Sequence, residues 1–139
     1  MASKITISNA LKAGLYAGII ASAINVILFL ILHSMGVITD DIEIQPGQSM
    51  TMVPILISSI LPTLIGSLIY FLFDKYSAKG MRNFMILSVI LLLLSFANPF
   101  MGIPGVTTAY AISLNVMHVV VFGALVFMLR KENEKLSLI

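Results

Sequence analysis

The sequence contains no cysteine and very few charged residues. Without cysteine, thiol redox chemistry, Cys-ligated zinc and iron–sulfur clusters are excluded. Charged residues make up 10% of the 139 residues, whereas soluble domains contain about 25%. A soluble domain of this size must cover most of its surface with polar groups, which this composition cannot supply. A water-soluble globule, an intrinsically disordered chain and a basic groove for nucleic acid are therefore excluded.

The sequence has instead four long hydrophobic stretches, and 59% of its residues are hydrophobic. The stretches cover residues 14–34, 53–73, 81–98 and 108–128. About 20 helical residues, each rising about 1.5 Å, cross a hydrocarbon core of roughly 30 Å. The sequence therefore predicts an all-α fold, a transmembrane four-helix bundle that forms a single membrane domain over residues 1–139. Residues 14–34 form a longer run than the apolar region of a signal peptide, and we interpret them as a retained helix.

The basic residues all flank the same side of the predicted bundle. They precede the first stretch, lie between the second and the third, or follow the fourth: Lys4, Lys12, Lys75, Lys79, Arg82, Arg130, Lys131 and Lys135. The opposite side receives Asp40, Asp41 and Glu43. Because positive charge near the ends of membrane spans stays in the cytoplasm, both termini are predicted to be cytoplasmic.

Each stretch has one side of small or polar residues, which is typical of surfaces that face other helices. At about 100° per residue, four sets of residues share a side: Gly14, Gly18, Ala21, Ser22 and Asn25; Met52, Ser59, Thr63, Gly66 and Tyr70; Ser88 and Ser95; Thr108, Ala111, Asn115 and His118. We expect these sides to face the interior, with Gly14 and Gly18 packed within the bundle rather than between subunits. In the first loop, alternating residues followed by Pro46-Gly47 are consistent with a short hairpin or cap.

Three polar residues near the middle of the spans form the candidate site. Asn25 and His118 lie near mid-membrane, and Asn115 is one turn from His118. Together they could bind a small polar ligand, with hydroxyl groups supplied by Ser59 and Thr63, because polar groups in hydrocarbon often mark a site. The alternative is an interhelical clasp, in which each hydrogen bond contributes about 0.6 kcal/mol on average. The sequence leaves both interpretations open.

No cofactor or metal is expected. A haem held by His33 and His118 is disfavoured, because their depths in the two spans differ by roughly 13 Å at the helical rise. Thioethers and imidazole suit Cu(I), but methionine is also a common apolar gap filler, and packing is the favoured interpretation here. The methionines concerned lie near His33 on the same side: Met35, Met50, Met52 and Met101.

The chain resembles two families of four-helix membrane proteins. Its size and topology are similar to those of the small multidrug-resistance exporters, but their membrane-embedded Glu is replaced here by Asn25, so the activity is not carried over. It more closely resembles an uncharacterised bacterial family of four-helix membrane proteins with a domain of unknown function. The residues that carry this resemblance are Asn25, Ser95-Phe96-Ala97-Asn98-Pro99 and Leu114-Asn115-Val116-Met117-His118. The resemblance implies a four-helix fold in the bacterial inner (plasma) membrane, without a known activity.

Two hypotheses for function remain. The first is a multi-pass protein without catalytic chemistry: an oligomeric channel, a passive solute pathway or a partner subunit. It is favoured because only Arg82, at the edge of its stretch, is charged within any span. No Asp or Glu within a span is therefore available for ion coupling or for a Ser–His–Asp triad. The second is a membrane-embedded ligand binder or enzyme that uses His118 with Asn115 and Asn25. The expected partners are the lipid bilayer and either further copies of the chain or another membrane protein, and no nucleic acid.

Overall fold

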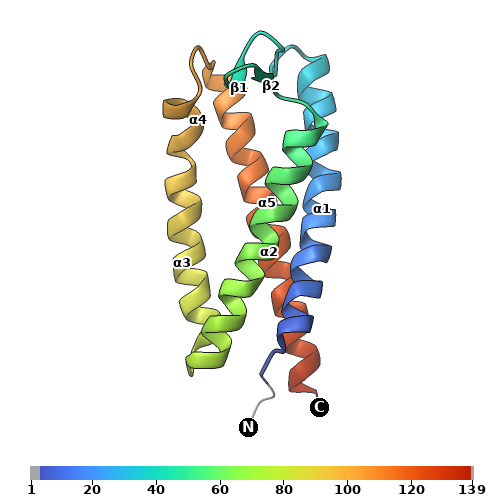
Figure 1. Cartoon of the computed structure of the whole chain (residues 1–139), viewed down its shortest axis with the longest axis vertical. Helices are drawn as coiled ribbons and strands as arrows, with labels where there is room; N and C mark the ends of the chain where they lie inside the picture. Colours follow the sequence, from blue (N-terminus) through green and yellow to red (C-terminus); the bar gives the residue numbers. More distant parts are fainter. Residues whose placement is uncertain (1–3, 139) are drawn as a thin grey trace.

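A computed structural model describes residues 4–138 and shows a bundle of four long helices (Figure 1). The helices are α1 (Ile7–Ser34), α2 (Met52–Tyr76), α3 (Gly80–Ser95) and α5 (Thr108–Ser137). A short helix, α4 (Ala97–Gly102), follows α3, and an antiparallel hairpin of β1 (Glu43–Gln45) and β2 (Gln48–Ser49) precedes α2. Both chain ends lie at one end of the bundle, the terminal end, and the hairpin lies at the other, the hairpin end.

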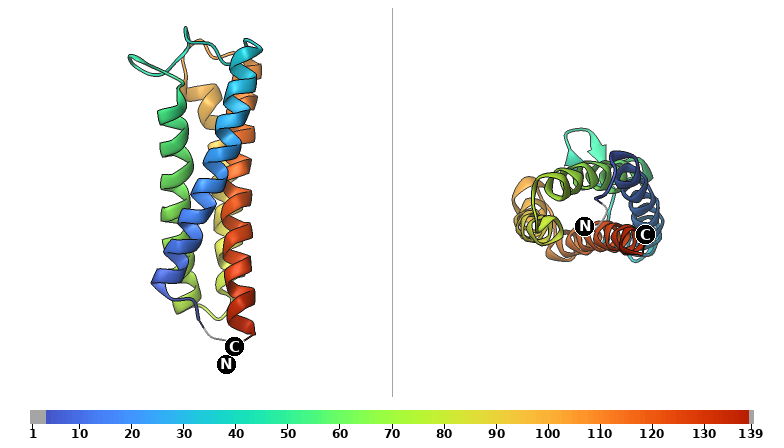
Figure 2. Two further views of the ribbon diagram at one scale, coloured as in Figure 1. Left: turned by 90° about the vertical axis from the view of Figure 1, so that its right-hand side faces the viewer. Right: turned by 90° about the horizontal axis from the view of Figure 1, so that it is seen from below.

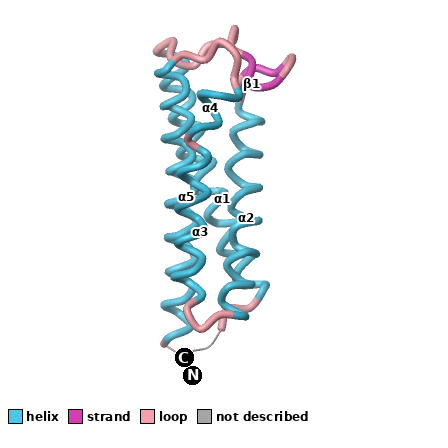
Figure 3. The backbone as a smooth tube through the Cα atoms, turned by 90° about the vertical axis from the view of Figure 1, so that its left-hand side faces the viewer, coloured by secondary structure: helices cyan, strands magenta, loops and turns pink. Residues whose placement is uncertain are grey.

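The helices have the length and composition of membrane spans. Among the described residues, four helical segments are long and apolar enough to cross a membrane, with α3 and α4 counted together from Gly80 to Gly102. The loops gather at the two ends of the bundle, apart from a short break between α3 and α4 (Figure 3). The predicted all-α transmembrane four-helix bundle is therefore confirmed, and this is the architecture of a membrane protein.

Small residues on α1 allow it to pack closely against α2. A Cβ atom placed on Gly14 would lie 2.8 Å from the Thr63 carbonyl oxygen, and one on Gly18 would lie 2.7 Å from Thr63 Oγ1. The two glycines therefore pack within the chain, as predicted. The opposite side of α1 is exposed and apolar, and includes Ile20, Ile24, Ile27 and Leu30.

The buried side of α2 repeats about every fourth residue. It consists of Ile55, Ser59, Thr63, Ser67 and Tyr70. The hydroxyl groups of Thr63 and Ser67 donate to carbonyl oxygens of α2 itself, so these polar residues are satisfied inside the bundle. The prediction that Met52 belongs to this side was wrong. Met52 is the first residue of α2 and is 47% exposed, because Met50 and Ile55 fill the neighbouring core.

The interior contains two apolar clusters, one in each half of the bundle. The cluster in the terminal half is built around Tyr70, Phe84, Leu125 and Leu129, together with small residues of α1. The ring of Phe84 packs edge-on against Tyr70, with 5.3 Å between the ring centroids. The cluster in the hairpin half contains Phe29, Ile38, Ile42, Met50, Ile55, Tyr110, Leu114 and Met117.

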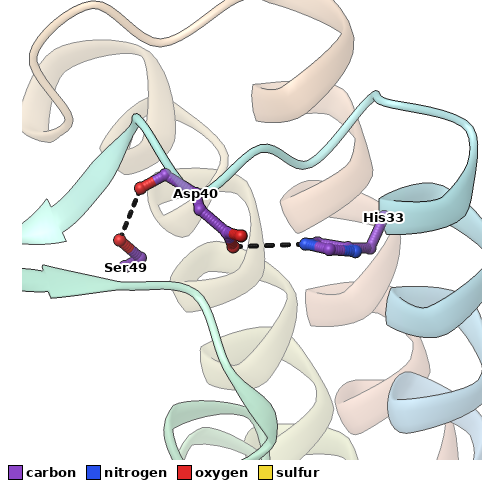
Figure 4. A network of polar contacts seen from close by, with 3 residues as sticks. All are labelled: His33, Asp40 and Ser49. Atoms are coloured by element: carbon purple, nitrogen blue, oxygen red, sulfur yellow. Dashed lines mark hydrogen bonds and ion pairs between the residues drawn. The ribbon is translucent and has the colours of Figure 1, made fainter.

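The hairpin projects beyond the bundle beside α2 (Figure 2). Gly47 has a φ of +75°, a conformation that favours glycine, so the predicted Pro46-Gly47 turn is present. Asp40 lies in the loop between α1 and the hairpin and contacts both His33 of α1 and Ser49 of β2 (Figure 4). Its Oδ1 lies 3.2 Å from His33 Nε2, and its carbonyl oxygen accepts a hydrogen bond of 2.6 Å from Ser49 Oγ. These contacts fix the loop over the end of α1.

The terminal end is held by contacts between the start of the chain and the end of α2. The backbone N–H of Ile5 donates to Asp74 Oδ2 at 2.9 Å, and Lys4 Nζ donates to the Lys75 carbonyl oxygen at 2.8 Å. The turn into α3 is tight, since a Cβ on Gly80 would lie 2.6 Å from Asp74 Cα. These contacts close the end of the bundle at which the basic residues gather.

Candidate functional site

Asn25 connects three helices in the middle of the bundle. It lies on the small-residue side of α1 and is only 2% exposed. Its Nδ2 group donates to Ser59 Oγ on α2 at 3.1 Å and to the Met117 carbonyl oxygen on α5 at 3.3 Å. Its Oδ1 atom is buried and has no hydrogen-bond partner among the described residues. The Nδ2 group of Asn25 thus joins α1 to α2 and α5, while its Oδ1 remains an acceptor without a partner.

His118 is joined to α3 through Ser95. The distance between Ser95 Oγ and His118 Nδ1 is 3.2 Å. The Ser95 hydroxyl also donates to the Leu92 carbonyl oxygen, one turn earlier in α3, at 2.7 Å. These two contacts fix the orientation of the imidazole ring on the side of α5 that faces α3.

Asn115 lies one turn from His118 and has a different role. Its Nδ2 donates at 3.1 Å to the carbonyl oxygen of Phe96, the residue between α3 and α4. The last carbonyl groups of a helix lack partners within the helix, and Asn115 satisfies one near this break. Its Oδ1 is buried without a partner in the part of the chain that the structure describes.

A cavity of about 670 Å³ lies in the hairpin half of the bundle. Its walls come from α2, α4 and α5, with Asn25 contributed by α1 and with residues of the hairpin at one end. The polar residues that line it are Asn25, Gln45, Gln48, Ser58, Asn98 and His118. The remaining walls are mostly aliphatic and include Ile55, Ile57, Leu61, Leu114, Met117 and Val121. None of the described residues that line the cavity carries a formal charge.

The cavity brings together two of the five predicted site residues. Asn25 and His118 line it, and Ser59 lies behind Asn25 as its hydrogen-bond partner. Thr63 instead packs against Gly18 and donates within α2, while Asn115 donates to the Phe96 carbonyl oxygen. The predicted group is therefore divided between the cavity wall and contacts that join helices.

Several residues that line or support the cavity were not among the predicted site residues. Ser95 holds His118, although it does not itself line the cavity, and Ser58 and Asn98 line the wall. Ser95 and Asn98 belong to the segment Ser95-Phe96-Ala97-Asn98-Pro99, whose Ser-x-x-x-Pro pattern carries part of the family resemblance. The pattern was therefore a signal for Ser95, while Asn98 occupies one of its variable positions. Helical periodicity placed Ser59, and not its neighbour Ser58, on the inward side of the second stretch, so it gave no signal for Ser58.

The residues considered for haem and copper lie in separate environments. His33 is at the hairpin end beside Asp40, whereas His118 is paired with Ser95. Met50 is buried in the apolar cluster, while the other three methionines of the group, Met35, Met52 and Met101, are exposed. Within residues 4–138, no three His, Cys, Asp or Glu side chains are grouped so that they could hold a metal ion.

The comparison with protein families identifies the chain at the level of its family. The match covers residues 6–135, which include all four long helices apart from the last residues of α5. The chain belongs to DUF6069, a family of unknown function. The resemblance to an uncharacterised family of membrane proteins is thus confirmed, and membership of DUF6069 assigns no activity to the cavity. No curated protein and no solved structure matches the chain.

Proposed function

We propose that this member of DUF6069 is a multi-pass membrane protein that binds a small amphiphilic molecule in the cavity of its hairpin half, without catalysing a reaction. The observation that carries the proposal is that Asn25 and His118, on two different helices, line one cavity with aliphatic walls. Cavities that bind small molecules have volumes of about 300–1,000 Å³, mostly apolar walls and a few polar groups that orient the ligand. The cavity of about 670 Å³ has these properties.

The position of the cavity favours entry from the bilayer. Ile57 and Leu61 of α2 line the cavity and are 57% and 53% exposed, so this wall is not covered by another helix of the bundle. A helix surface of this kind faces acyl chains in a membrane. An apolar molecule dissolved in the bilayer can therefore reach the cavity without crossing water.

The packing of the other half supports a binding site over a pore through one copy. Tyr70, Phe84, Leu125 and Leu129 fill the interior of the terminal half and are nearly or fully buried. A path for solutes through a single chain would have to displace this cluster. The lining also lacks a carboxylate that could work with His118 as an acid or base, which supports binding without catalysis.

Assembly with other membrane helices is a second candidate function, favoured by the exposure of α3. In the segment from Gly80 to Gly102 only 11% of the most hydrophobic window is buried, against 28–33% in the other three spans. Exposed apolar residues on this segment include Ile86, Ile90, Leu93 and Leu94. Further copies of the chain or a partner protein could cover this surface. A channel or passive pathway would then lie between subunits, and the mass of the complex in lipid nanodiscs tests this role.

The fold also supports the proposed location in a bacterial inner membrane with both termini in the cytoplasm. Lys75, Lys79 and Arg82 lie at the turn between α2 and α3, and Arg130 and Lys131 are near the end of α5, all toward the terminal end. The acidic residues of the first loop lie at the hairpin end. This separation of charge follows the rule that basic residues remain on the cytoplasmic side.

Photolabelling of a cavity-filled variant tests the binding function. The probe is a dodecyl alcohol with a diazirine in its alkyl chain, added to the purified full chain in lipid nanodiscs. We expect saturable labelling of cavity residues. Val121→Trp should reduce this labelling at least about tenfold, because the indole ring would fill part of the cavity. Val119→Trp is the matched control, since Val119 lies on the exposed side of α5 and is not a lining residue. Equal labelling of the two variants, or labelling that never saturates, would contradict the proposal.

A further inference from the structure

The polar groups in the wall of the cavity can be assigned as donors or acceptors from their other contacts. Asn25 is the first. Both of its Nδ2 hydrogens are used, one on Ser59 Oγ and one on the Met117 carbonyl oxygen. The amide cannot be turned over, because its oxygen would then face the Met117 carbonyl oxygen, which is also an acceptor. Asn25 therefore offers only Oδ1, a buried acceptor with no partner among residues 4–138.

The tautomer of His118 follows from the hydrogen bonds of Ser95. The Ser95 hydroxyl has a single hydrogen, and it is donated to the Leu92 carbonyl oxygen at 2.7 Å. In the contact of 3.2 Å with His118, Ser95 Oγ must therefore accept, and His118 Nδ1 must carry the hydrogen. In a neutral imidazole the other nitrogen, Nε2, is then an acceptor.

The charge of the ring is also limited by its surroundings. The described residues that line the cavity include no Asp or Glu that could balance an imidazolium. A charged group without a partner is costly in an apolar environment, so the ring is neutral. The hydroxyl of Ser58, a further lining residue, donates to the Ile55 carbonyl oxygen at 3.2 Å and is left with free lone pairs. Asn25 on α1, Ser58 on α2 and His118 on α5 thus offer hydrogen-bond acceptors and no free donor.

From this pattern we propose that the cavity selects a neutral hydrogen-bond donor, namely the hydroxyl group of a single-chain lipid such as a long-chain alcohol. The inference rests on the proposed binding function and specifies its ligand. A hydroxyl beside His118 donates to the free Nε2, and a small shift of the Asn25 side chain would let the same hydroxyl reach its buried, unpartnered Oδ1, while the aliphatic walls hold the alkyl chain. An ether of the same size has no hydrogen to donate, and an ammonium group brings a charge that no lining carboxylate balances.

The hairpin end of the cavity does not set this preference. Gln45 and Gln48 lie there, with Asn98 of α4 also in the lining, and a free amide both donates and accepts. These residues can accommodate the polar part of many molecules, including water. Selection therefore depends on Asn25 and His118, whose hydrogens are committed to the protein.

Three probes with the same dodecyl chain and diazirine test the selectivity. They end in a hydroxyl, a methyl ether or an ammonium group, and each is added to the full chain in lipid nanodiscs. We expect the alcohol to reach half-maximal labelling of the cavity at a concentration about fivefold lower than the ether, since a net hydrogen bond contributes about 1 kcal/mol. If alcohol and ether label the cavity equally, the inference is wrong while the binding function stands. If none of the probes labels the cavity saturably, the binding function itself fails.

Ser95→Ala tests whether Ser95 acts as a positioning residue for His118. Ser95 does not line the cavity, so its loss leaves the walls in place but frees His118 to carry its hydrogen on either nitrogen. We expect the preference for alcohol over ether to fall at least about threefold, with labelling by the alkyl chain retained. Ser88→Ala, two turns earlier on α3, is the matched control and should keep the full preference. A purely structural role of Ser95 would weaken all probes equally and would contradict the inference.

The tautomer can also be measured without any ligand. The chain has two histidines, so in a His33→Gln variant every histidine ring signal belongs to His118. Nitrogen-15 NMR of this variant should show a protonated Nδ1 and an unprotonated Nε2, and the Nε2 signal should shift when the alcohol is added. A protonated Nε2 in the free protein would overturn the assignment of acceptors.

Discussion

Gly18 of α1 lies directly against Thr63 of α2, so closely that a Cβ atom on Gly18 would be 2.7 Å from Thr63 Oγ1. Two turns further along α1, Asn25 reaches Ser59 Oγ at 3.1 Å. The close approach of the two backbones brings the amide within hydrogen-bond distance of α2. The contact at Gly18 therefore also positions one of the two polar residues of the cavity.

Gly18→Ala should lower the stability of the bundle. The added methyl group would also lie 3.0 Å from Ile60 Cα, a backbone atom, so the helices must move apart. Overpacking of this kind destabilises by about 1–3 kcal/mol, which thermal unfolding in detergent would detect. Gly123→Ala is the matched control, because nothing lies within 4 Å of a Cβ at that position. Equal melting temperatures for the two variants would contradict this account of the α1–α2 contact.

The clasp formed by Asn25 can be measured by a double-mutant cycle. Asn25→Ala, Ser59→Ala and the double variant isolate the energy of the hydrogen bond between the two side chains. We expect a coupling energy of about 0.6 kcal/mol and at most about 1.7 kcal/mol, as found for hydrogen bonds between membrane helices. Reversible unfolding in mixed micelles provides the measurement. A coupling energy of zero would show that the two side chains do not stabilise the bundle together.

The absence of cysteine makes the topology simple to test. Single-cysteine variants, Gln48→Cys in the hairpin and Ser137→Cys in the last turn of α5, are treated in intact bacterial cells with a maleimide that does not cross membranes. If both termini are cytoplasmic, the first variant reacts at once and the second reacts only after the membrane is permeabilised. The reverse pattern would place the termini outside, and reaction of both variants in intact cells would argue against the three spans between them, since an odd number of spans puts the two sites on opposite sides.

Asp74→Ala should loosen the start of the chain. The Asp74 carboxylate accepts the backbone N–H of Ile5 at 2.9 Å, next to the contact between Lys4 and the Lys75 carbonyl oxygen. Without this acceptor, trypsin should cut after Lys4 several-fold faster, as followed by the intact mass of the protein in nanodiscs. Glu134→Ala removes an exposed carboxylate of α5 and serves as the control. An unchanged rate in Asp74→Ala would show that other contacts hold this segment.

The fold was largely predictable because each of its main features follows from local patterns. Four apolar runs of sufficient length predict four helices, and Pro46-Gly47 between short alternating segments is typical of a hairpin. The burial of the small-residue side of α1 follows from helical periodicity. The errors at Met52 and at Thr108, which was also predicted to face the interior but is exposed, arose at the first residues of α2 and α5, where the chain direction changes and periodicity no longer determines which residue reaches the core.

The candidate site was only partly predictable, because it depends on how the helices diverge. Asn25, Asn115 and His118 share comparable depth, but Asn115 is drawn to the Phe96 carbonyl oxygen by the break between α3 and α4. Pro99 indicates a break in this region, because its ring clashes with the carbonyl of Ser95 four residues earlier. The predicted stretch nevertheless ran to Asn98, whereas α3 ends at Ser95. The partner of His118 and the space beside it depend on that break.

The division of the third span into α3 and α4 has a consequence for the surrounding lipid. Helix α3 has 16 residues, which at about 1.5 Å each extend about 24 Å, less than a hydrocarbon layer of roughly 30 Å. The bilayer must thin beside this face, or the break between the two helices must lie within the acyl region, where Asn115 already supplies a partner for the Phe96 carbonyl oxygen. In a bilayer with longer acyl chains, the mismatch in length is therefore greatest beside α3. We expect the positions of α4 and of the adjacent cavity wall to change with the thickness of the membrane.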